Sequence, residues 1–138
     1  MTVRRAVRDD WPAIIEMMRA CHAASNYTEP FCDMSAARML EAAETDHAAC
    51  FVNEDATGFL FLALTPLHFN HSAISANELG FWGRDGRALI AAGRVWAKNA
   101  GAGRLVMGSE DQIRGPAMAR FYRMQGLKPF ANNYEVRL

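Results

Sequence analysis

Residues 78–90 combine an apolar run, two glycines and two arginines in an order that could bind a phosphate group. The apolar run ends at Gly83, and a helical pattern begins after Gly86. The first backbone N–H groups of a helix have no partner within the helix, and the helix dipole places positive charge there. Glycines in the preceding turn let the backbone approach an anion closely. The turn therefore predicts an anion site, although a tight structural connection would explain the same glycines equally well.

Arg84 and Arg87 lie on either side of Gly86. Because a guanidinium presents a planar fork of donors to phosphate oxygens, we expect at least one of them to contact the anion. Solvated surface positions are the alternative. Residues 1–70 carry five Lys and Arg against ten Asp and Glu, whereas residues 71–138 carry ten against five. The basic second half favours an anionic ligand at the turn.

The chain has 138 residues, of which 51% are hydrophobic and 22% charged, and we expect one globular domain over residues 1–138. No apolar run is long enough to span a membrane, and the first residues lack the apolar core of a secretory signal. We therefore expect a cytoplasmic protein with no membrane partner. Cys21, Cys32 and Cys50 lack the spacing of a disulfide framework or a zinc site. A net charge of zero, without a basic cluster rich in aromatics, argues against nucleic acid as a partner.

Hydrophobic periodicity predicts the elements that must position the turn. Strands are expected at 3–7, 48–53 and 59–64, in a segment ending at 79–82, at 105–109, and on either side of Asn132-Asn133. Helices are expected after Asp9 or Asp10, from Ser35, from the turn to Asn99, and from Gly115. The order βααβββαβαββ indicates a three-layer α/β fold with a single sheet.

Two further segments carry residues that could contact a substrate or a metal. The loop between the first two predicted helices could close over a substrate, although most loops are only connections. Its candidates are Tyr27, Glu29, Phe31 and Cys32. His68 and His71 fall near the tip of a predicted hairpin. Since no third ligand is evident for these histidines, we expect no metal site.

The last predicted helix carries Phe121-Tyr122, followed by Gly126-Leu127. Together with the element order and the turn at residues 83–86, this ending resembles the GNAT superfamily of acetyl-CoA-dependent N-acetyltransferases, over essentially the whole chain. The resemblance implies a three-layer αβα fold with about four helices and a single mixed, mostly antiparallel sheet of six to seven strands. Residues 70–96 are also similar to GNAT proteins encoded in phage and prophage genomes.

The family binds the pyrophosphate of its cofactor with the motif Gln/Arg-x-x-Gly-x-Gly/Ala, placed before a helix with an aliphatic pair. When Leu89-Ile90 is set on that pair, Gly86 matches the last position, whereas Phe81 and Arg84 occupy the other two. The strand and helix are joined by fewer residues than the family normally uses, and Gly115 stands where relatives often have Asn. These departures favour an alternative, a GNAT-like binding or assembly module, phage-related, that has lost catalysis.

The resemblance implies acetyl-CoA as cosubstrate and an unidentified primary amine, on a small molecule or a protein, as acceptor. The implied cofactor-binding residues are Gly80, Phe81, Trp82, Gly83, Arg84, Asp85, Gly86, Arg87 and Ala88. A backbone N–H at Gly80 or Phe81 would polarise the thioester carbonyl. The candidate residues for contact with the acceptor are Tyr27, Phe31, His71 and Ser109. Relatives frequently dimerise, so a homodimer is one expected assembly.

The resemblance also assigns two catalytic roles. Tyr122 would be the general acid for the departing thiolate, and packing beside Phe121 is the alternative. Glu78 would remove the proton of the amine, directly or through water, and a solvated strand edge is the alternative. The candidate substitutes for Glu78 are Ser109, Glu110 and His71.

Overall fold

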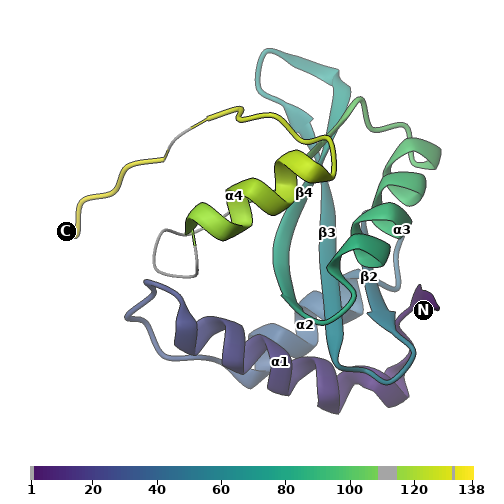
Figure 1. Ribbon diagram of the computed structural model, residues 1–138, viewed down its shortest axis with the longest axis vertical. Helices are drawn as coiled ribbons and strands as arrows, with labels where there is room; N and C mark the ends of the chain where they lie inside the picture. The colour runs from purple at the N-terminus through teal and green to yellow at the C-terminus, as the bar shows by residue number, and fades with distance from the viewer. Residues whose placement is uncertain (1, 109–114, 132) are drawn as a thin grey trace.

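The structure is a computed structural model that describes residues 2–108, 115–131 and 133–138. Strand β1 (Val3–Arg5) and one turn of 3-10 helix, η1 (Arg8–Asp10), precede helices α1 (Trp11–Ala24) and α2 (Asp33–Ala42). Three strands follow, which are β2 (Ala48–Asn53), β3 (Gly58–Leu67) and β4 (Asn70–Gly83). Helix α3 (Gly86–Asn99), strand β5 (Arg104–Val106) and helix α4 (Gly115–Met124) come last (Figure 1).

A single sheet with strand order β1-β2-β3-β4-β5 forms the middle layer. Neighbouring strands are antiparallel, except that β4 and β5 run parallel. Helices α1 and α2 cover one face of the sheet, and α3 covers the other. The expected α/β class with one mixed, mostly antiparallel sheet is therefore confirmed. None of the described helices combines the length and the apolar composition needed to cross a membrane.

Three sequence-based expectations about the elements are wrong. The strand expected at 105–109 is β5, which ends at Val106 and leaves Met107 and Gly108 outside it. The described residues form five strands rather than six or seven, because residues 127–131 and 133–138, around Asn132-Asn133, lie in no strand. A strand needs a neighbour with which to exchange backbone hydrogen bonds, and β5 offers only three residues. Helix α2 begins at Asp33 with Cys32 at its N-cap, so Ser35 lies inside the helix and does not cap it.

The C-terminal segment crosses instead to the loop between α1 and α2. Arg137 donates a hydrogen bond to the carbonyl of Asn26 at 2.9 Å and another to the hydroxyl of Thr28, and it lies 3.6 Å from the Glu29 carboxylate. In Figure 1 the segment leaves α4 and runs away from α3. It therefore connects the end of the chain to the α1–α2 side of the molecule.

Strand alternation divides the core between the two faces of the sheet. Ala48, Cys50 and Val52 face α1 and α2, whereas Ala49 and Phe51 face α3. Because both faces are covered, β2 is buried at every position. Burial raises the pKa of Cys50 to about 12, so its thiol packs as a small apolar group.

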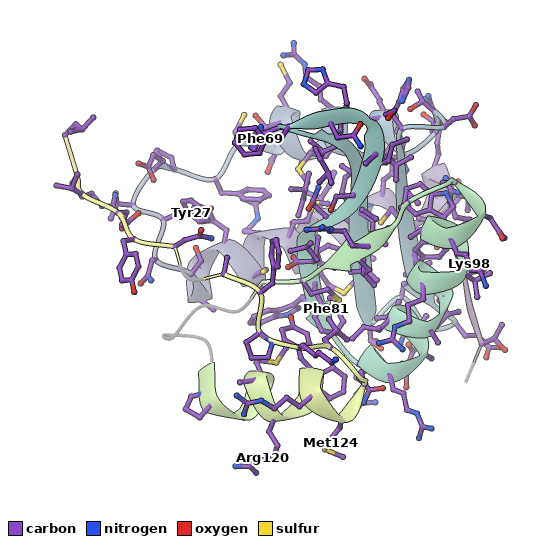
Figure 2. The ribbon with its side chains drawn as sticks, turned by 90° about the horizontal axis from the view of Figure 1, so that it is seen from above. Tyr27, Phe69, Phe81, Lys98, Arg120 and Met124 are labelled. Atoms are coloured by element: carbon purple, nitrogen blue, oxygen red, sulfur yellow. The ribbon has the colours of Figure 1, made fainter. Side chains whose placement is uncertain are left out.

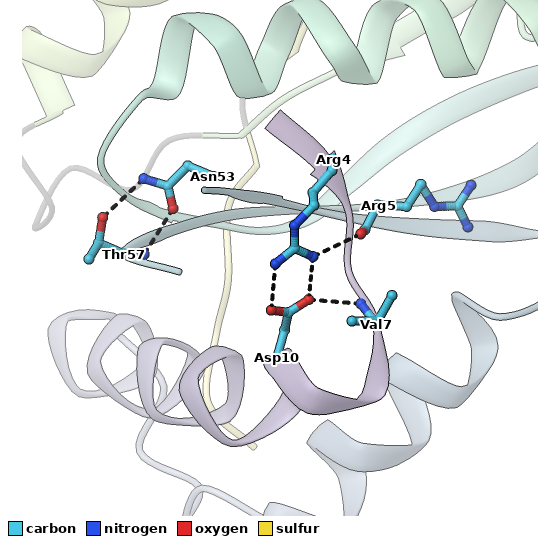
Figure 3. Close-up of polar contacts among 6 residues, drawn as sticks. All are labelled: Arg4, Arg5, Val7, Asp10, Asn53 and Thr57. Carbon is cyan, nitrogen blue, oxygen red and sulfur yellow. Dashed lines mark hydrogen bonds and ion pairs between the residues drawn. The ribbon is translucent and has the colours of Figure 1, made fainter. Parts of the chain in front are cut away.

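Asp10 joins β1 to the beginning of α1 (Figure 3). Its carboxylate accepts the N–H of Val7 at 2.8 Å and two hydrogen bonds from the guanidinium of Arg4, at 2.6 and 2.9 Å. Asp10 occupies the N-cap position of α1, as expected, but its side chain makes no capping bond to the helix. The hydrogen bonds from Arg4 hold the pKa of Asp10 below its ordinary value.

Candidate active site

Strands β4 and β5 separate near Glu78. Their parallel ladder joins residues 75–77 to β5, and beyond it β4 continues to Gly83 with β3 as its partner. The register with β3 shifts between the pair Phe61–Gly80 and the pair Leu62–Glu78, so the residue between Glu78 and Gly80 is an extra, bulged one. Bulges redirect side chains and are common beside active sites. The sheet thus opens on the side where Glu78 was expected to act.

Gly108 connects the two residues that were predicted to be catalytic. Its N–H donates to Oε2 of Glu78 at 3.1 Å, and its carbonyl accepts the hydrogen bond of the Tyr122 hydroxyl at 2.7 Å. Strand β4 supplies Glu78 and helix α4 supplies Tyr122, so two segments far apart in the sequence meet at a residue that lies shortly after β5. The structure therefore brings Tyr122 and Glu78 together, while their roles stay a prediction. The sequence singled out Gly108 only as a member of the strand expected at 105–109, whereas in the structure it lies two residues after the end of β5.

Tyr122 is almost completely enclosed, with 8% of its surface exposed. The rings of Phe81 and Phe121 lie beside it, with centroid distances of 6.4 and 6.0 Å. Burial raises the pKa of the Tyr122 phenol, and the carboxylate of Glu78 raises it further. The phenol is therefore protonated at neutral pH and acts as a hydrogen-bond donor.

The predicted phosphate turn consists of Arg84 and Asp85, the two residues between β4 and α3. The first hydrogen bond of α3 runs from the N–H of Leu89 to the carbonyl of Asp85, so the preceding N–H groups have no partner within the helix. The Asp85 carboxylate accepts a hydrogen bond from the side-chain amide of Asn53 at 2.7 Å. An acidic side chain of the protein thus already lies at the positive end of the helix dipole.

Close backbone packing accounts for the glycine at position 83. A Cβ on Gly83 would lie 2.1 Å from the carbonyl oxygen of Thr57, which also accepts the N–H of Arg84 at 3.1 Å. Gly83 has a φ of 90°, a conformation that favours glycine. A Cβ on Gly58 would likewise lie 2.1 Å from the carbonyl oxygen of Arg84. The tight-connection alternative therefore explains Gly83 without any ligand.

Two aromatic rings cover Gly86. A Cβ there would lie 2.8 Å from Cζ of Phe81 and 3.2 Å from Cζ of Phe121. Because the Cβ atoms of a helix tilt toward its N-terminus, these rings lie against the first turn of α3. Figure 2 shows Phe81 on the side of the sheet that faces α4. The rings occupy the space beside Gly86, whereas the side chains of Arg84 and Arg87 in the same turn are exposed, so the binding of a phosphate there stays a prediction.

The predicted cofactor-binding run does not lie on one surface. A Cβ on Gly80 would lie 2.9 Å from the ring of Phe59, and Trp82 packs against the cluster under α1 and α2. Phe81 belongs instead to the side of α3. Residues 80–88 are thus divided between the two faces of the sheet and the first turn of α3.

The predicted acceptor-binding residues lie in different parts of the molecule. Tyr27 stacks on His22 with a centroid distance of 6.4 Å, and Phe31 meets the same imidazole edge-on at 5.7 Å. His71 lies at the β3–β4 turn, roughly 20 Å along the strand from Glu78. Ser109 and its neighbour Glu110 lie outside the described residues. Within the described residues, no three His, Cys, Asp or Glu side chains gather as metal ligands.

A groove of about 1440 Å³ runs beside β5, between the second half of α3, the C-terminal half of α4 and the C-terminal segment. Gly108 and Tyr122 line it, and so does Tyr27 from the α1–α2 loop. In Figure 2 Tyr27 lies next to the C-terminal segment. The groove therefore reaches both Tyr122 and one of the predicted acceptor-binding residues.

No family model and no curated protein matches the sequence of this chain, but its structure is similar to many solved ones. Among them is a transcriptional regulator from Bacillus halodurans C-125, with a TM-score of 0.77 and 19% identity over 99% of both chains. Another is AAC(6′)-Iy in complex with a bisubstrate analogue of CoA, with a TM-score of 0.76 and 15% identity over 99% of this chain and 97% of that one. The chain has the GNAT fold.

A glucosamine-6-phosphate N-acetyltransferase from Arabidopsis thaliana also shares the GNAT fold with this chain, with a TM-score of 0.72 and 11% identity over 99% of this chain and 97% of that one. Since all these identities are low, the similarity establishes the fold. It confirms the GNAT-like α/β fold implied by the element order, the turn at residues 83–86 and the Phe121-Tyr122 ending, though not the six to seven strands.

Proposed function

We propose that this chain is an N-acetyltransferase that moves the acetyl group of acetyl-CoA to a primary amine of a small molecule or a protein. Two observations support the proposal, namely the GNAT fold and the hydrogen-bonded group formed by Glu78, Gly108 and Tyr122. The second observation carries it, because it places a carboxylate and a buried hydroxyl beside the point where β4 and β5 separate. The acceptor would be an amine, because a carboxylate such as Glu78 attracts its positively charged ammonium form and can accept a proton from the nitrogen.

The bound cosubstrate would supply an acetyl thioester, and the residues of this chain would assist its transfer. Glu78 would accept the proton that the amine loses when its nitrogen forms the new bond to the acetyl carbon. The Tyr122 hydroxyl would turn from the carbonyl of Gly108 to the sulfur that leaves. Its proton would stabilise the negative charge that develops there, and general acid catalysis of this kind contributes about 10²- to 10⁴-fold in rate.

Replacing Tyr122 by Phe tests the role of its hydroxyl. We expect Tyr122→Phe to slow acetyl transfer by about 10²- to 10⁴-fold, because the donor to the leaving sulfur is lost. Affinity for CoA, measured by titration calorimetry, should stay close to that of the unmodified protein, because the aromatic ring remains. Equal losses of rate and affinity would instead identify Tyr122 as a structural residue.

A second candidate function is a non-catalytic GNAT-like binding or assembly module, including the phage-related kind that residues 70–96 resemble. The departures at Phe81, Arg84 and Gly115 from the family's pattern favour it, and the rings of Phe81 and Phe121 take up space beside Gly86. Titration of the protein with CoA separates the two candidates. Saturable binding supports the transferase, and its complete absence supports the module.

A further inference from the structure

Asn53, the last residue of β2, uses its whole side chain in hydrogen bonds, and the side chain is fully buried. Its carbonyl oxygen accepts the backbone N–H groups of Thr57 and Gly58, both at 2.8 Å. Its amide nitrogen donates to the hydroxyl of Thr57 at 3.0 Å and to the carboxylate of Asp85 at 2.7 Å. The first three bonds stay within the β2–β3 turn, and the fourth connects this turn to the residue that precedes α3.

Asp85 occupies the N-cap position of α3 but does not cap the helix. An N-cap residue usually has an extended backbone, and its side chain then accepts the N–H of the second or third helical residue. Asp85 instead has a left-handed backbone, with φ 60° and ψ 31°, and its side chain makes no capping bond. A residue other than glycine adopts this conformation at a cost in energy. The hydrogen bond from Asn53 to the Asp85 carboxylate compensates for that cost.

Because the Asp85 carboxylate is bonded to Asn53, the first donors of α3 keep their capacity to bind an anion. Among the described residues, no group accepts a hydrogen bond from the backbone N–H of Gly86, Arg87 or Ala88. Unpaired N–H groups at a helix start favour an anionic ligand. A capping carboxylate would accept one of these N–H groups and place its own charge in front of the others.

We propose that Asn53 is a positioning residue of the acyl-donor site. The inference rests on the proposed acetyltransferase function and on the expected place of the CoA phosphates at the β4–α3 turn. By holding the Asp85 carboxylate, Asn53 keeps it from capping α3 and leaves the first N–H groups of the helix to the phosphates. Asn53 acts through Asp85 and does not itself touch the ligand.

A double-mutant cycle tests this role. Asn53→Ala removes the donor that holds Asp85. Asp85→Gly removes the carboxylate that could cap the helix, and glycine tolerates the left-handed backbone. The unmodified protein, the two single variants and the double variant are titrated with CoA and with pantetheine, which lacks the phosphates. Calorimetry gives the dissociation constants, and circular dichroism shows whether each variant is folded.

We expect Asn53→Ala alone to weaken CoA binding by about 10-fold, because the released Asp85 caps α3 and competes with the phosphates. In the chain that carries Asp85→Gly, the same change at Asn53 should alter CoA binding by no more than about twofold. Pantetheine should bind all four proteins equally well. If Asn53→Ala weakened CoA binding equally with and without Asp85→Gly, Asn53 would have a structural role only, and the proposal would be overturned.

A second comparison serves if Asn53→Ala does not fold, since that variant leaves buried backbone N–H groups without their acceptor. Serine is a favoured N-cap residue, so Asp85→Ser should cap α3 and bind CoA about 10-fold more weakly than Asp85→Gly does. Equal CoA affinities of these two variants would overturn the proposal and leave the transferase function intact. If the unmodified protein bound neither CoA nor pantetheine, the proposed function would fail and the role of Asn53 with it.

Discussion

Gly108 places its backbone N–H and carbonyl between a carboxylate and a phenol. Its N–H donates to Glu78 and its carbonyl accepts from Tyr122, so both side chains are hydrogen-bonded to the same residue. The negative charge of Glu78 also raises the pKa of Tyr122, after the larger effect of burial. Glu78 therefore affects Tyr122 through its charge as well as through Gly108, and substitutions need to separate charge from hydrogen bonding.

Two substitutions of Glu78 make that separation. Glu78→Gln keeps an acceptor for the N–H of Gly108 but cannot take a proton from an amine, so we expect acetyl transfer to fall by about 10²-fold or more. The melting temperature should stay unchanged, because the hydrogen bond is retained. Glu78→Ala removes the acceptor as well and should also lower the melting temperature.

The rate as a function of pH gives a second measurement on the same variants. A general base produces a rising limb that Glu78→Gln abolishes. If Glu78→Gln were as active as the unmodified protein and only Glu78→Ala were slow, Glu78 would position Gly108 and would not be the base.

At the scale of elements, the connection between β4 and α3 packs closely against the β2–β3 turn of residues 53–58, and we call this contact the joint. Gly58 begins β3 and Gly83 ends β4. Because neither has a side chain, the backbones of the β2–β3 turn and the β4–α3 connection can come into contact. Asn53 supports the joint, since its fully buried side chain donates to the carboxylate of Asp85 and, at 3.0 Å, to the hydroxyl of Thr57. Figure 3 shows the contact with Thr57. The joint fixes the direction in which α3 leaves the sheet.

Alanine substitutions at two glycines measure the packing of this joint. Gly83 and Gly101 have nearly the same φ, 90° and 87°. A Cβ on Gly101 would meet no atom of the described residues within 4 Å, whereas a Cβ on Gly83 would lie 2.1 Å from Thr57. We expect Gly101→Ala to cost about 1 kcal/mol of unfolding free energy, from backbone strain alone. Gly83→Ala should cost at least about 1–2 kcal/mol more, because the backbone of Thr57 must shift.

Urea unfolding of both variants gives the two free energies directly. Equal costs at the two positions would show that the turn of residues 53–58 can move away from α3.

At the scale of the whole molecule, the edge strand β1 and helix α1 are held together by Asp10. Its side chain is 10% exposed, whereas that of Arg4 is 43% exposed. Hydrogen bonds from Arg4 lower the pKa of Asp10 in the folded state, so the folded protein holds its carboxylate charged at a lower pH than the unfolded chain does. The stability due to Asp10 is therefore present above its ordinary pKa of about 4 and is lost as the pH falls through the lowered pKa.

Asp10→Asn tests this dependence on the global unfolding of the protein. We expect the variant to lose about 1 kcal/mol of unfolding free energy at neutral pH, because the charged hydrogen bonds to Arg4 are lost. The difference between variant and unmodified protein should shrink as the pH falls below about 4, where Asp10 of the unfolded chain takes up a proton, and should vanish below the lowered pKa of the folded state. Glu16→Gln, an exposed change on α1, serves as the control. If the difference in unfolding free energy stayed constant with pH, the Asp10 side chain would stabilise the fold through its packing and not through its charge.

Local patterns in the sequence predict most of the elements and the core. Ile14 and Met18 recur at helical spacing and are buried in α1, and the apolar run from Phe59 forms the covered strand β3. Such elements depend on hydrogen bonds and side-chain spacing between neighbours in the chain, so the sequence alone contains the signal. The prediction of strands on either side of Asn132-Asn133 was wrong, because such strands need a distant partner, β5, and β5 has only three residues.

The sequence by itself determined the order of most elements, the GNAT architecture implied by Phe121-Tyr122, and Glu78 and Tyr122 as candidates. Only the tertiary structure decided that these two residues meet at Gly108 and that the rings of Phe81 and Phe121 pack against Gly86. It also decided that basic side chains line the groove beside β5, none of them in an ion pair of the described chain. Contacts of this kind join residues that lie tens of positions apart. Their geometry depends on how helices pack on the sheet, which no local spacing encodes.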